Sequence, residues 1–426
     1  MNLKRNIQPE IRPVELKSIP EAEIFYLKNG IPLYIIDAGS EELMRIEFIF
    51  DAGQVREDST LVSSTTNSML LEGSKNYNAK EINNAFDFYG AFINPFIQKD
   101  SAGVTVFLLN KYLEKILELC CEILFRPVFP EEEIDNLQKK RLQLYLMNKQ
   151  KVQNLAYDKF FESVFGPAHP YGKQILQADF GNVTKESLLK FHNDHYAKGS
   201  LAIIISGHIH AEAKSVIERY CSEFELKPDT TEDKKVTING NKSKSVFIEK
   251  KDALQTAIRI GSATINKRHK DYPGLLILDT ILGGYFGSRL MKNIREEKGY
   301  TYGINSTVMS LSQSGYKVIS TEVGSKFTGK TIEEIYKEIR LLQKNPVEHS
   351  ELDVVRSYMA GEMLRMFDGP FALAESFRGV WEFGLDNNYY YNLAEKIRNI
   401  CPDEITGLAN TYYNIDDLYE IIAGSK

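Results

Sequence analysis

One order of predicted elements occurs twice in this chain, and that repeat limits the possible fold more than any other feature. Residues 23–209 read as strands, two helices, a strand pair, further helices and a closing strand, and residues 245–425 read in the same order. A pattern that recurs in this way indicates an internal duplication. Because strand runs and helix runs are separate, we expect each half to be an α+β domain, with helices packed on one face of a mainly antiparallel sheet.

A polar segment separates the two halves. Residues 226–243 are rich in Lys, Asp, Thr and Asn, show no helical period, and read as a linker. We therefore expect an N-terminal domain at residues 1–225 and a C-terminal domain at residues 244–426. A chain of 426 residues is long enough for two domains that each bury a substantial core.

Composition excludes several classes of protein. The net charge is −6 and no basic block occurs, so nucleic acid is not an expected partner. No apolar run reaches the roughly 18 residues that a membrane-spanning helix needs, so no membrane association is expected. The N-terminal segment lacks the apolar stretch of a secretory signal. The four cysteines form no C-x-x-C motif, and we expect them to be reduced thiols of a cytoplasmic protein.

A predicted helix over residues 59–72 has distinctive flanks. The sequence Asp-Ala-Gly at 51–53 precedes it, and residues 69–74 read Met-Leu-Leu-Glu-Gly-Ser. Downstream, residues 169–172 read His-Pro-Tyr-Gly, and residues 282–303 form the most specific of these segments. On these residues, nearly the whole chain resembles the pitrilysin/insulinase family of zinc peptidases, in its processing-peptidase-like form. The resemblance implies two homologous domains joined into a bent, clam-like half chamber.

The family carries its metal motif, H-x-x-E-H, on the first of these helices, and this chain lacks it. The matching positions are Ser64, Thr65, Thr66, Asn67 and Ser68. Positions one, four and five of the motif share a helix face, where the family has two zinc-binding histidines and the glutamate that activates the metal-bound water. Hydroxyl and amide groups are poor zinc ligands, so Ser64, Asn67 and Ser68 mark a degenerate zinc site. The family's third ligand, a glutamate, is expected near residues 141–146, which contain no carboxylate.

The resemblance also assigns a catalytic pair. Arg295 and Tyr302 match an arginine and a tyrosine, seven residues apart, that reach the zinc site of the other half in the family. Guanidinium and phenol groups are hydrogen-bond donors, and such donors stabilise the oxyanion that forms when a peptide bond is attacked. The alternative is that Arg295 pairs with Glu296 or Glu297 near a helix end and that Tyr302 is an ordinary strand residue.

Two further segments bear on peptide binding. In the family a glycine-rich loop contacts substrate, and the matching positions here are Gly283, Gly284, Tyr285, Phe286 and Gly287. An ordinary helix end followed by a turn would explain the same glycines. The family also binds its peptide on an edge strand, but Pro95 in the matching strand has no backbone N–H to donate. That proline is equally compatible with a simple strand kink.

Histidine pairs offer other candidate sites. His192 and His195 lie three residues apart, and His208 and His210 follow a predicted strand. No carboxylate or thiol stands at a diagnostic spacing from the second pair, so we expect structural or surface roles for both pairs. A serine hydrolase would need a base beside a serine of the 59–72 helix, and the chain has no G-x-S-x-G motif.

The expected function follows from the resemblance. The chain is expected to be the non-zinc subunit of a heterodimeric peptidase, with no metal or other cofactor of its own and with zinc on a partner that carries H-x-x-E-H. It would contribute the Arg295 and Tyr302 side chains, the 283–287 loop and half of the chamber to the hydrolysis of peptides. Two alternatives stay open. One is a purely structural or peptide-binding homologue without a catalytic role, and the other is an autonomous hydrolase with a relocated site.

Overall fold

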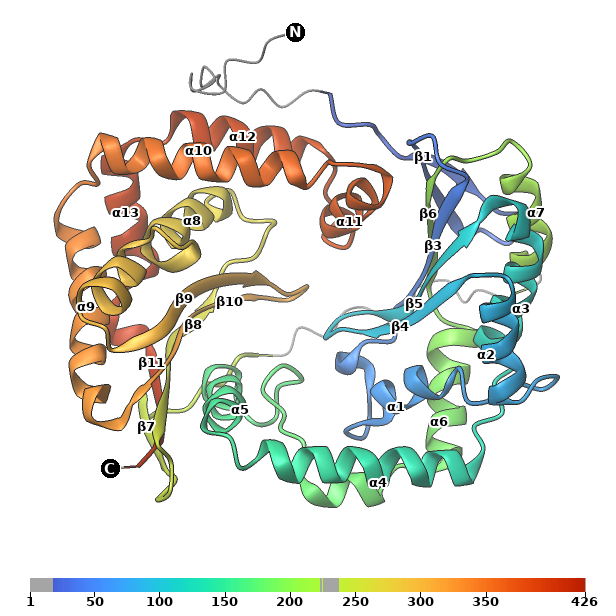
Figure 1. The fold of residues 1–426 in the computed structure, drawn as a ribbon, viewed down its shortest axis with the longest axis horizontal. Coiled ribbons are helices and arrows are strands. Elements are labelled where there is room, and N and C mark those ends of the chain that lie inside the picture. The colour runs from blue at the N-terminus through green and yellow to red at the C-terminus, as the bar shows by residue number, and fades with distance from the viewer. Residues whose placement is uncertain (1–17, 223, 225–236, 426) are drawn as a thin grey trace, which may run out of the picture.

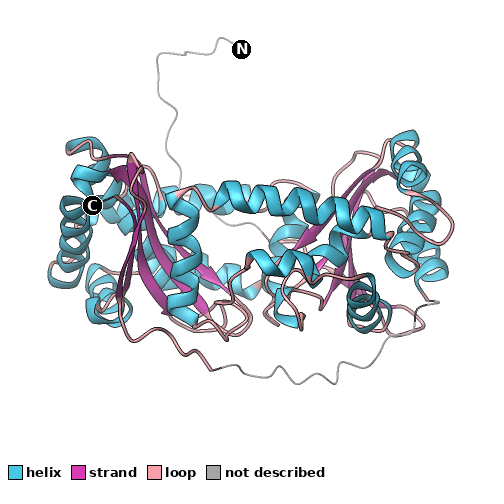
Figure 2. Cartoon of the chain, turned by 90° about the horizontal axis from the view of Figure 1, so that it is seen from below, coloured by secondary structure: helices cyan, strands magenta, loops and turns pink. Residues whose placement is uncertain are grey.

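The computed structural model describes residues 18–222, 224 and 237–425. Figure 1 shows two halves of similar construction, each with a sheet toward the middle of the molecule and helices outside it. Seen from below, the same two sheets stand apart with helices running between them (Figure 2). The predicted linker, residues 226–243, lies largely outside the described residues, as do positions 1–17 of the expected N-terminal domain.

The two sheets share one strand order, apart from the additional edge strand β1 of the first sheet. The first is ordered β1-β2-β6-β3-β5-β4 and the second β7-β11-β8-β10-β9. In each sheet one parallel pair, β2 with β6 or β7 with β11, stands beside antiparallel neighbours. The internal duplication and the mainly antiparallel α+β fold are therefore confirmed. The strands are β1 (Glu23–Tyr26), β2 (Pro32–Asp37), β3 (Leu43–Phe50), β4 (Phe92–Ile97), β5 (Ala102–Leu109), β6 (Leu201–Gly207), β7 (Ser245–Glu249), β8 (Gln255–Thr264), β9 (Thr301–Ser310), β10 (Gly315–Gly324) and β11 (Tyr419–Gly424).

Local interactions and backbone conformation set the starts of helices α2 and α1. Helix α2 has a reciprocal cap, in which Asn78 Oδ1 accepts from Glu81 N at 3.0 Å and Glu81 Oε2 accepts from Asn78 N at 2.9 Å. Helix α1 is shorter than the predicted 59–72 helix because Leu61 has a φ of 75°, which lies outside the helical region. No helix of the described residues is long and apolar enough to cross a lipid bilayer. The helices are α1 (Val62–Met69), α2 (Ala79–Phe88), α3 (Leu113–Phe125), α4 (Glu131–Asn148), α5 (Val152–Phe165), α6 (Lys185–His192), α7 (Ala213–Cys221), α8 (Tyr272–Asp279), α9 (Thr328–Lys344), α10 (His349–Arg365), α11 (Pro370–Trp381), α12 (Asn388–Asn399) and α13 (Pro402–Tyr412). Of the shorter segments, η2 (Asn110–Tyr112) is a 3₁₀ helix, and η5 (Thr280–Gly284) and η6 (Met291–Glu297) are π-helical.

Each half sends one helix onto the sheet of the other half. Helix α5 packs against β8 and β11, and helix α11 packs against β2 and β6. Phe161 and Phe165 of α5 join a buried cluster with Ile421 of β11, and Trp381 Nε1 of α11 donates to Tyr34 Oη of β2 at 2.8 Å. Long helix α4, which leads into α5, runs from the first half toward the second along the bottom of Figure 1. The halves are therefore interlocked. The sequence predicts helices on one face of each sheet, but it does not predict that a helix from one half packs on the sheet of the other.

A buried ionic network holds α11 in this position. Arg45 and Glu47 of β3 form an ion pair and are only 6% and 1% exposed. From the second half, Phe371 O accepts a hydrogen bond from Arg45 Nη1 at 2.9 Å, and Arg378 Nη1 lies 3.9 Å from Glu47 Oε2. Removal of one partner from a buried ion pair typically costs about 3–5 kcal/mol. This network is therefore expected to oppose separation of the two halves.

The duplication extends to a buried polar contact. In the first half, Asn67 Nδ2 of α1 donates to Tyr196 Oη at 3.1 Å. In the second half, Tyr413 Oη donates to Asp279 Oδ1 of α8 at 2.9 Å. Each helix follows the matching strand, β3 or β8, and each tyrosine precedes the closing strand, β6 or β11. The tyrosine contact is thus kept in both halves, with the amide of Asn67 as its partner in the first and the carboxyl group of Asp279 in the second. Burial raises the pKa of Asp279 to about 6.

Candidate functional site

An acidic residue closes the N-terminal end of helix α1, which carries the degenerate zinc-site positions. Glu57 Oε2 accepts a hydrogen bond from Ser63 N at 3.1 Å and so satisfies one of the N–H groups that a helix start leaves unpaired. Burial raises the pKa of Glu57 to about 7, and the hydrogen bond from Ser63 and the charge of Lys173 only partly oppose this rise. Glu57 is therefore partly protonated near neutral pH.

Two of the degenerate positions have different surroundings. Ser64 lines a cavity, and its Oγ donates to Leu61 O at 3.2 Å. Asn67 is 2% exposed, and its amide donates to Gly103 O at 3.0 Å and to Tyr196 Oη at 3.1 Å. The Asn67 side chain thus lies in the core of the first half, although its spacing from Ser64 predicts a shared face toward a wet cavity.

Arg141 of helix α4 donates hydrogen bonds to three oxygen atoms of helix α1. Its Nη1 reaches Thr65 Oγ1 at 2.9 Å, and its Nη2 reaches Ser68 Oγ at 2.7 Å and Ser64 O at 3.2 Å. Gln138, one turn earlier on α4, donates to the same Thr65 Oγ1 at 2.9 Å. The family's third zinc ligand is expected in this part of α4. In this chain the same part of α4 instead places the Arg141 guanidinium against α1.

This guanidinium adds a positive charge where the family binds a cation. Burial lowers the pKa of Arg141, but an arginine in a protein stays protonated at physiological pH. Two unit charges 4 Å apart interact by about 4 kcal/mol at an effective dielectric constant of roughly 20, and a divalent ion doubles that repulsion. Because Ser64 and Ser68 offer only hydroxyl groups and Arg141 repels a cation, these residues do not fit a zinc ion.

Glu57, Gln138 and Arg141 are the residues of this site that sequence reasoning missed. Gln138 and Arg141 are three residues apart, a spacing that places both on one face of a helix, and this was the available signal. Glu57 gave no comparable signal, because its position at the start of α1 depends on the left-handed backbone of Leu61.

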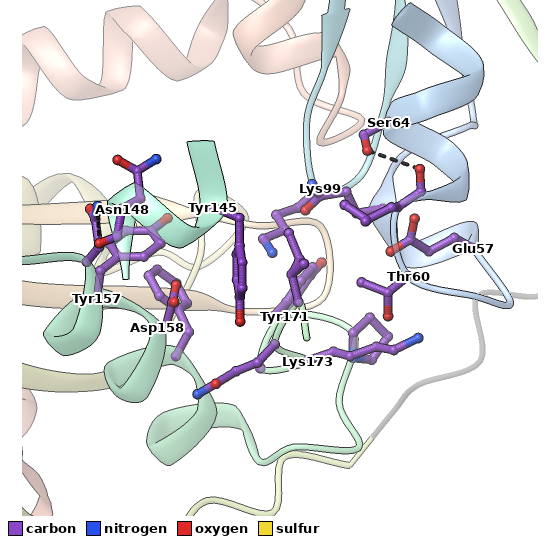
Figure 3. Close-up of a pocket in the computed structure, with 18 of the residues that line it drawn as sticks. Glu57, Thr60, Ser64, Lys99, Tyr145, Asn148, Tyr157, Asp158, Tyr171 and Lys173 are labelled. Carbon is purple, nitrogen blue, oxygen red and sulfur yellow. Dashed lines mark hydrogen bonds between the residues drawn. The ribbon is translucent and has the colours of Figure 1, made fainter. Parts of the chain in front are cut away.

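A cavity of about 660 Å³ opens beside α1 (Figure 3). Its wall comes from α1, α4, α5 and the segment 168–175. Cationic groups on this wall outnumber acidic ones, with Lys99, Arg141, Lys149 and Lys173 against Glu57 and Asp158. Lys149 Nζ pairs with Asp158 Oδ2 at 3.0 Å, and burial lowers the pKa of Lys99. The charges of this cavity suit a small anionic group, such as a peptide carboxylate.

The His-Pro-Tyr-Gly segment connects the cavity wall to the second half. Tyr171 Oη donates to Asp100 Oδ1 at 2.5 Å, and Asp100 also accepts hydrogen bonds from the N and Oγ atoms of Ser312, both at 2.9 Å. His169 Nδ1 accepts from Tyr171 N at 3.1 Å and so fixes the turn. These contacts give the segment a structural role at the junction between the halves.

Arg295 and Tyr302 lie on the second half. The Arg295 guanidinium lies over the ring of Phe286, 4.7 Å from its centroid, and so contacts the glycine-rich loop. Tyr302 on β9 is 91% exposed and lines a separate cavity of about 370 Å³. Gln153 and Asn154, adjacent residues of α5, line the Tyr302 cavity and the α1 cavity respectively. The start of α5 therefore lies between the predicted catalytic tyrosine and the degenerate zinc site.

The glycine-rich loop, residues 283–287, has one clear structural requirement. A Cβ atom on Gly283 would lie 2.6 Å from Ser306 N, so this glycine allows η5 to approach β9 closely. The two aromatic residues of the loop differ in exposure, since Tyr285 is half-buried and Phe286 is 62% exposed. Close packing against β9 explains why residue 283 is a glycine. The Phe286 ring, in contrast, is exposed to solvent and contacts the Arg295 guanidinium on one face.

The remaining predicted positions have ordinary surroundings. Pro95 lies on β4, the edge strand beside β5. The His192 Nε2 atom lies 2.7 Å from Leu124 O, and the His195 Nδ1 atom lies 3.1 Å from Asp51 O. Burial lowers the pKa of both histidines, so each ring is neutral and donates to a backbone carbonyl. His192 and His195 thus contact different partners and do not converge on one point.

These features define a protein of two tandem α+β domains whose helix α1 carries no His, Cys, Asp or Glu side chain. Two family models match the chain. The one described as Insulinase (Peptidase family M16) covers residues 39–177, and the one described as Peptidase M16 inactive domain covers residues 182–359. The chain belongs to the M16 (insulinase) family of peptidases.

Curated relatives carry names that agree with this assignment, and solved structures share the fold. The "Uncharacterized zinc protease YmxG" of Bacillus subtilis is 23% identical over 341 residues, 79% of this chain and 82% of the relative. An "Uncharacterized zinc protease" of Rickettsia felis is 29% identical over 332 residues, 72% of this chain and 78% of the relative. The crystal structure of a peptidase M16 inactive domain from Pseudomonas fluorescens has a TM-score of 0.85 and 22% identity, covering 95% of this chain and 98% of its own. A protease from Helicobacter pylori has a TM-score of 0.85 and 16% identity, covering 95% and 99%, and these two likenesses concern the fold.

Proposed function

We propose that this chain is the non-zinc subunit of a heterodimeric M16-family peptidase. The observation that carries the proposal is the Arg141 guanidinium, bound to Thr65 and Ser68 at the positions of the family's metal motif. A partner with an intact H-x-x-E-H motif supplies the zinc ion, the attacking water and the general base. This chain holds no zinc on α1 and contributes half of the chamber in which a peptide is cleaved.

In this proposal Arg295 and Tyr302 act on the partner's site. A phenol that stabilises an oxyanion on another chain has to be exposed in the isolated subunit, and Tyr302 is 91% exposed. The Arg295 guanidinium is steadied over the Phe286 ring, a contact worth about 0.5–1 kcal/mol at an exposed site. The exposed face of the 283–287 loop then contacts the peptide beside these two donors.

The first half contributes less to peptide binding in this account. Pro95 on the edge strand β4 cannot donate a backbone hydrogen bond to an added strand. Peptides therefore bind chiefly through the partner and through the second half of this chain. We place the heterodimer in the cytoplasm, on the argument that Cys120, Cys121, Cys221 and Cys401 are all free thiols.

One observation favours the alternative of a peptide-binding homologue without a catalytic role. The α1 cavity keeps a volume of about 660 Å³ and an excess of cationic groups, as a binding site for a peptide carboxylate would. A relocated serine site has less support, because Ser64 Oγ donates to a carbonyl and Ser68 Oγ accepts from Arg141. A nucleophilic serine needs a base as its hydrogen-bond acceptor.

Reconstitution tests the proposal. The chain is mixed with an H-x-x-E-H relative from the same cell, and the mixture is followed by size-exclusion chromatography and cleavage of a fluorogenic peptide. We expect a stable pair, with cleavage in the mixture and not with either chain alone. Full activity of the partner alone would assign this chain the structural or peptide-binding role.

A further inference from the structure

A carboxylate and two imidazoles meet at the end of the first sheet that is remote from α1. Glu42 comes just before β3, and His208 and His210 follow β6. Because β3 and β6 are antiparallel, the start of one lies beside the end of the other. The ligand atoms of the three side chains all lie within 4.8 Å of one another. No other His, Cys, Asp or Glu side chains gather in this way within the described part of the chain.

The distances are close to those of a metal site. Glu42 Oε2 lies 2.7 Å from His210 Nε2, and Glu42 Oε1 lies 3.8 Å from His208 Nε2. Zinc binds such atoms at about 2.0–2.2 Å in a tetrahedron, which sets neighbouring ligand atoms roughly 3.4 Å apart. The carboxylate would separate slightly from one imidazole and approach the other, and each shift is smaller than about 1 Å. Small rotations of exposed side chains are sufficient for that change.

Neighbouring groups hold the Glu42 carboxylate and the backbone of the 208–210 segment in position. Asn110 of η2 donates through Nδ2 to Glu42 Oε2 at 3.1 Å and to His208 O at 2.7 Å, and its backbone N donates to Glu42 O at 3.1 Å. Asp37 Oδ1 accepts a hydrogen bond from Ile209 N, between the two histidines, at 3.0 Å. Groups of this kind, which orient ligands without touching the ion, typically change metal affinity by about 10–100-fold. The two segments are thus arranged before any ion binds.

We propose that Glu42, His208 and His210 form a binding site for a divalent transition-metal ion, with zinc as the expected occupant. Imidazole and carboxylate together favour zinc and its neighbours in the periodic table over calcium or magnesium, which bind through oxygen alone. The side chains are 62%, 42% and 46% exposed, so water completes the coordination. A bound ion cross-links the β2–β3 connection to the segment after β6.

This site is independent of the proposed function, since it uses no residue of α1, η5, η6 or β9. The sequence alone predicts structural or surface roles for His208 and His210, because no carboxylate or thiol stands at a diagnostic spacing from them. The third ligand, Glu42, is distant in sequence and is brought beside them by the pairing of β3 with β6. Only the fold therefore reveals the site.

Isothermal titration of the chelator-treated full chain with zinc chloride tests the site, with magnesium chloride as the comparison ion. We expect one zinc ion per chain and no saturable binding of magnesium. Zinc affinity should fall at least about tenfold in His208→Ala, in His210→Ala and in Glu42→Gln, and to a smaller extent in Asn110→Ala. Circular dichroism of each variant checks that the fold is kept.

His269→Ala is the matched control. His269 is 42% exposed and lies 3.9 Å from the carboxylate of Asp271, much as His208 is 42% exposed and lies 3.8 Å from that of Glu42. It lacks a second imidazole, so its loss should leave zinc binding unchanged. Absence of stoichiometric zinc binding by the unaltered chain, or undiminished binding by the folded His208→Ala/His210→Ala variant, would overturn the proposal.

Discussion

The Nη2 atom of Arg141 on α4 lies 2.7 Å from the Oγ atom of Ser68 on α1. The same guanidinium reaches Thr65 Oγ1, so one side chain joins the two helices by several hydrogen bonds. The resemblance to zinc peptidases implies that a metal ion bound by the matching helices would provide that connection in a member with H-x-x-E-H. In our proposal the permanently charged guanidinium of Arg141 takes over this connection between α1 and α4.

Arg141→Ala should destabilise the folded chain by about 1.5–3 kcal/mol, because Thr65 and Ser68 lose charge-assisted hydrogen bonds. Urea unfolding followed by circular dichroism measures this loss. Lys140→Ala, a change at the exposed neighbouring residue, should shift the unfolding free energy by no more than about 0.5 kcal/mol. Equal unfolding midpoints for the two variants would show that the Arg141 contacts do not stabilise the site.

Glu57 should make stability depend on pH. Its pKa is about 7 in the folded chain and about 4.3 when unfolded. The folded state thus holds this proton more tightly, so the stabilisation is complete below about pH 4.3 and is lost as the pH rises through 7. Glu57→Gln stays neutral and should therefore gain about 1–3 kcal/mol relative to the parent between pH 5 and pH 8.

The comparison between parent and Glu57→Gln isolates this residue. Burial also raises the pKa of Asp279, to about 6, so this residue likewise makes the free energy of unfolding fall as the pH rises. Because Asp279 is present in both proteins, its contribution cancels from the difference between the parent and Glu57→Gln. Urea unfolding at pH 5 and at pH 8 provides the four free energies. A difference that is the same at both pH values would mean that Glu57 is ionised in the folded chain throughout this range.

Arg295→Ala or Tyr302→Phe should lower kcat of the reconstituted heterodimer by roughly 10²–10³, the usual effect of losing one oxyanion donor. Folding and pairing should be unaffected, because neither side chain fills a core position. Steady-state kinetics with a fluorogenic peptide measures the effect. If Arg295→Ala leaves both kcat and KM unchanged, the chain takes no part in the chemistry and the structural alternative replaces the proposal.

Variants of two nearby cationic residues serve as controls, because they distinguish a loss of catalysis from a change in charge or in stability. Lys292→Ala changes an exposed charge of η6 and should leave kcat as it is. Arg289 forms a two-pronged ion pair with Glu351, with Nε–Oε1 at 2.9 Å and Nη2–Oε2 at 2.7 Å. Arg289→Ala should therefore lower the unfolding free energy rather than kcat. A drop in kcat for Lys292→Ala would point to a general effect of charge.

The fold could be predicted from the sequence because its signals are local. Apolar periodicity and the repeated order of elements predict both sheets. The boundary of α1 could not be predicted, since Leu61 adopts a left-handed backbone that nothing in its side chain favours. The packing of α5 and α11 on the sheet of the opposite half could not be predicted either, because it depends on contacts between segments that are distant in the sequence.

The site was predictable in part for the same reason. The absence of zinc ligands at Ser64 and Ser68 is visible in the sequence, because it concerns residue types at fixed positions. The contact of Arg141 with Ser68 and the meeting of Glu42 with His208 depend on the packing of distant segments. Neither can be derived from spacing along the chain.

Restoring the motif with Ser64→His, Asn67→Glu and Ser68→His should not produce a zinc peptidase. Arg141 would remain beside the new imidazoles, and α4 would still lack the third ligand. A carboxylate at position 67 would also face Gly103 O in the core, which now accepts a hydrogen bond from Asn67, and this should destabilise the fold. Peptide cleavage with bound zinc by this triple variant would show that the site has changed less than we infer.

The zinc content of the His208→Ala/His210→Ala variant tests the central claim most directly, because this variant lacks the proposed surface site and keeps α1 intact. The variant is dialysed against a trace of chelator and analysed by plasma mass spectrometry. Our account predicts no stoichiometric zinc, since Arg141 occupies the place of the ion between α1 and α4. One tightly held zinc ion per chain, lost when Ser64 and Ser68 are changed to alanine, would contradict it.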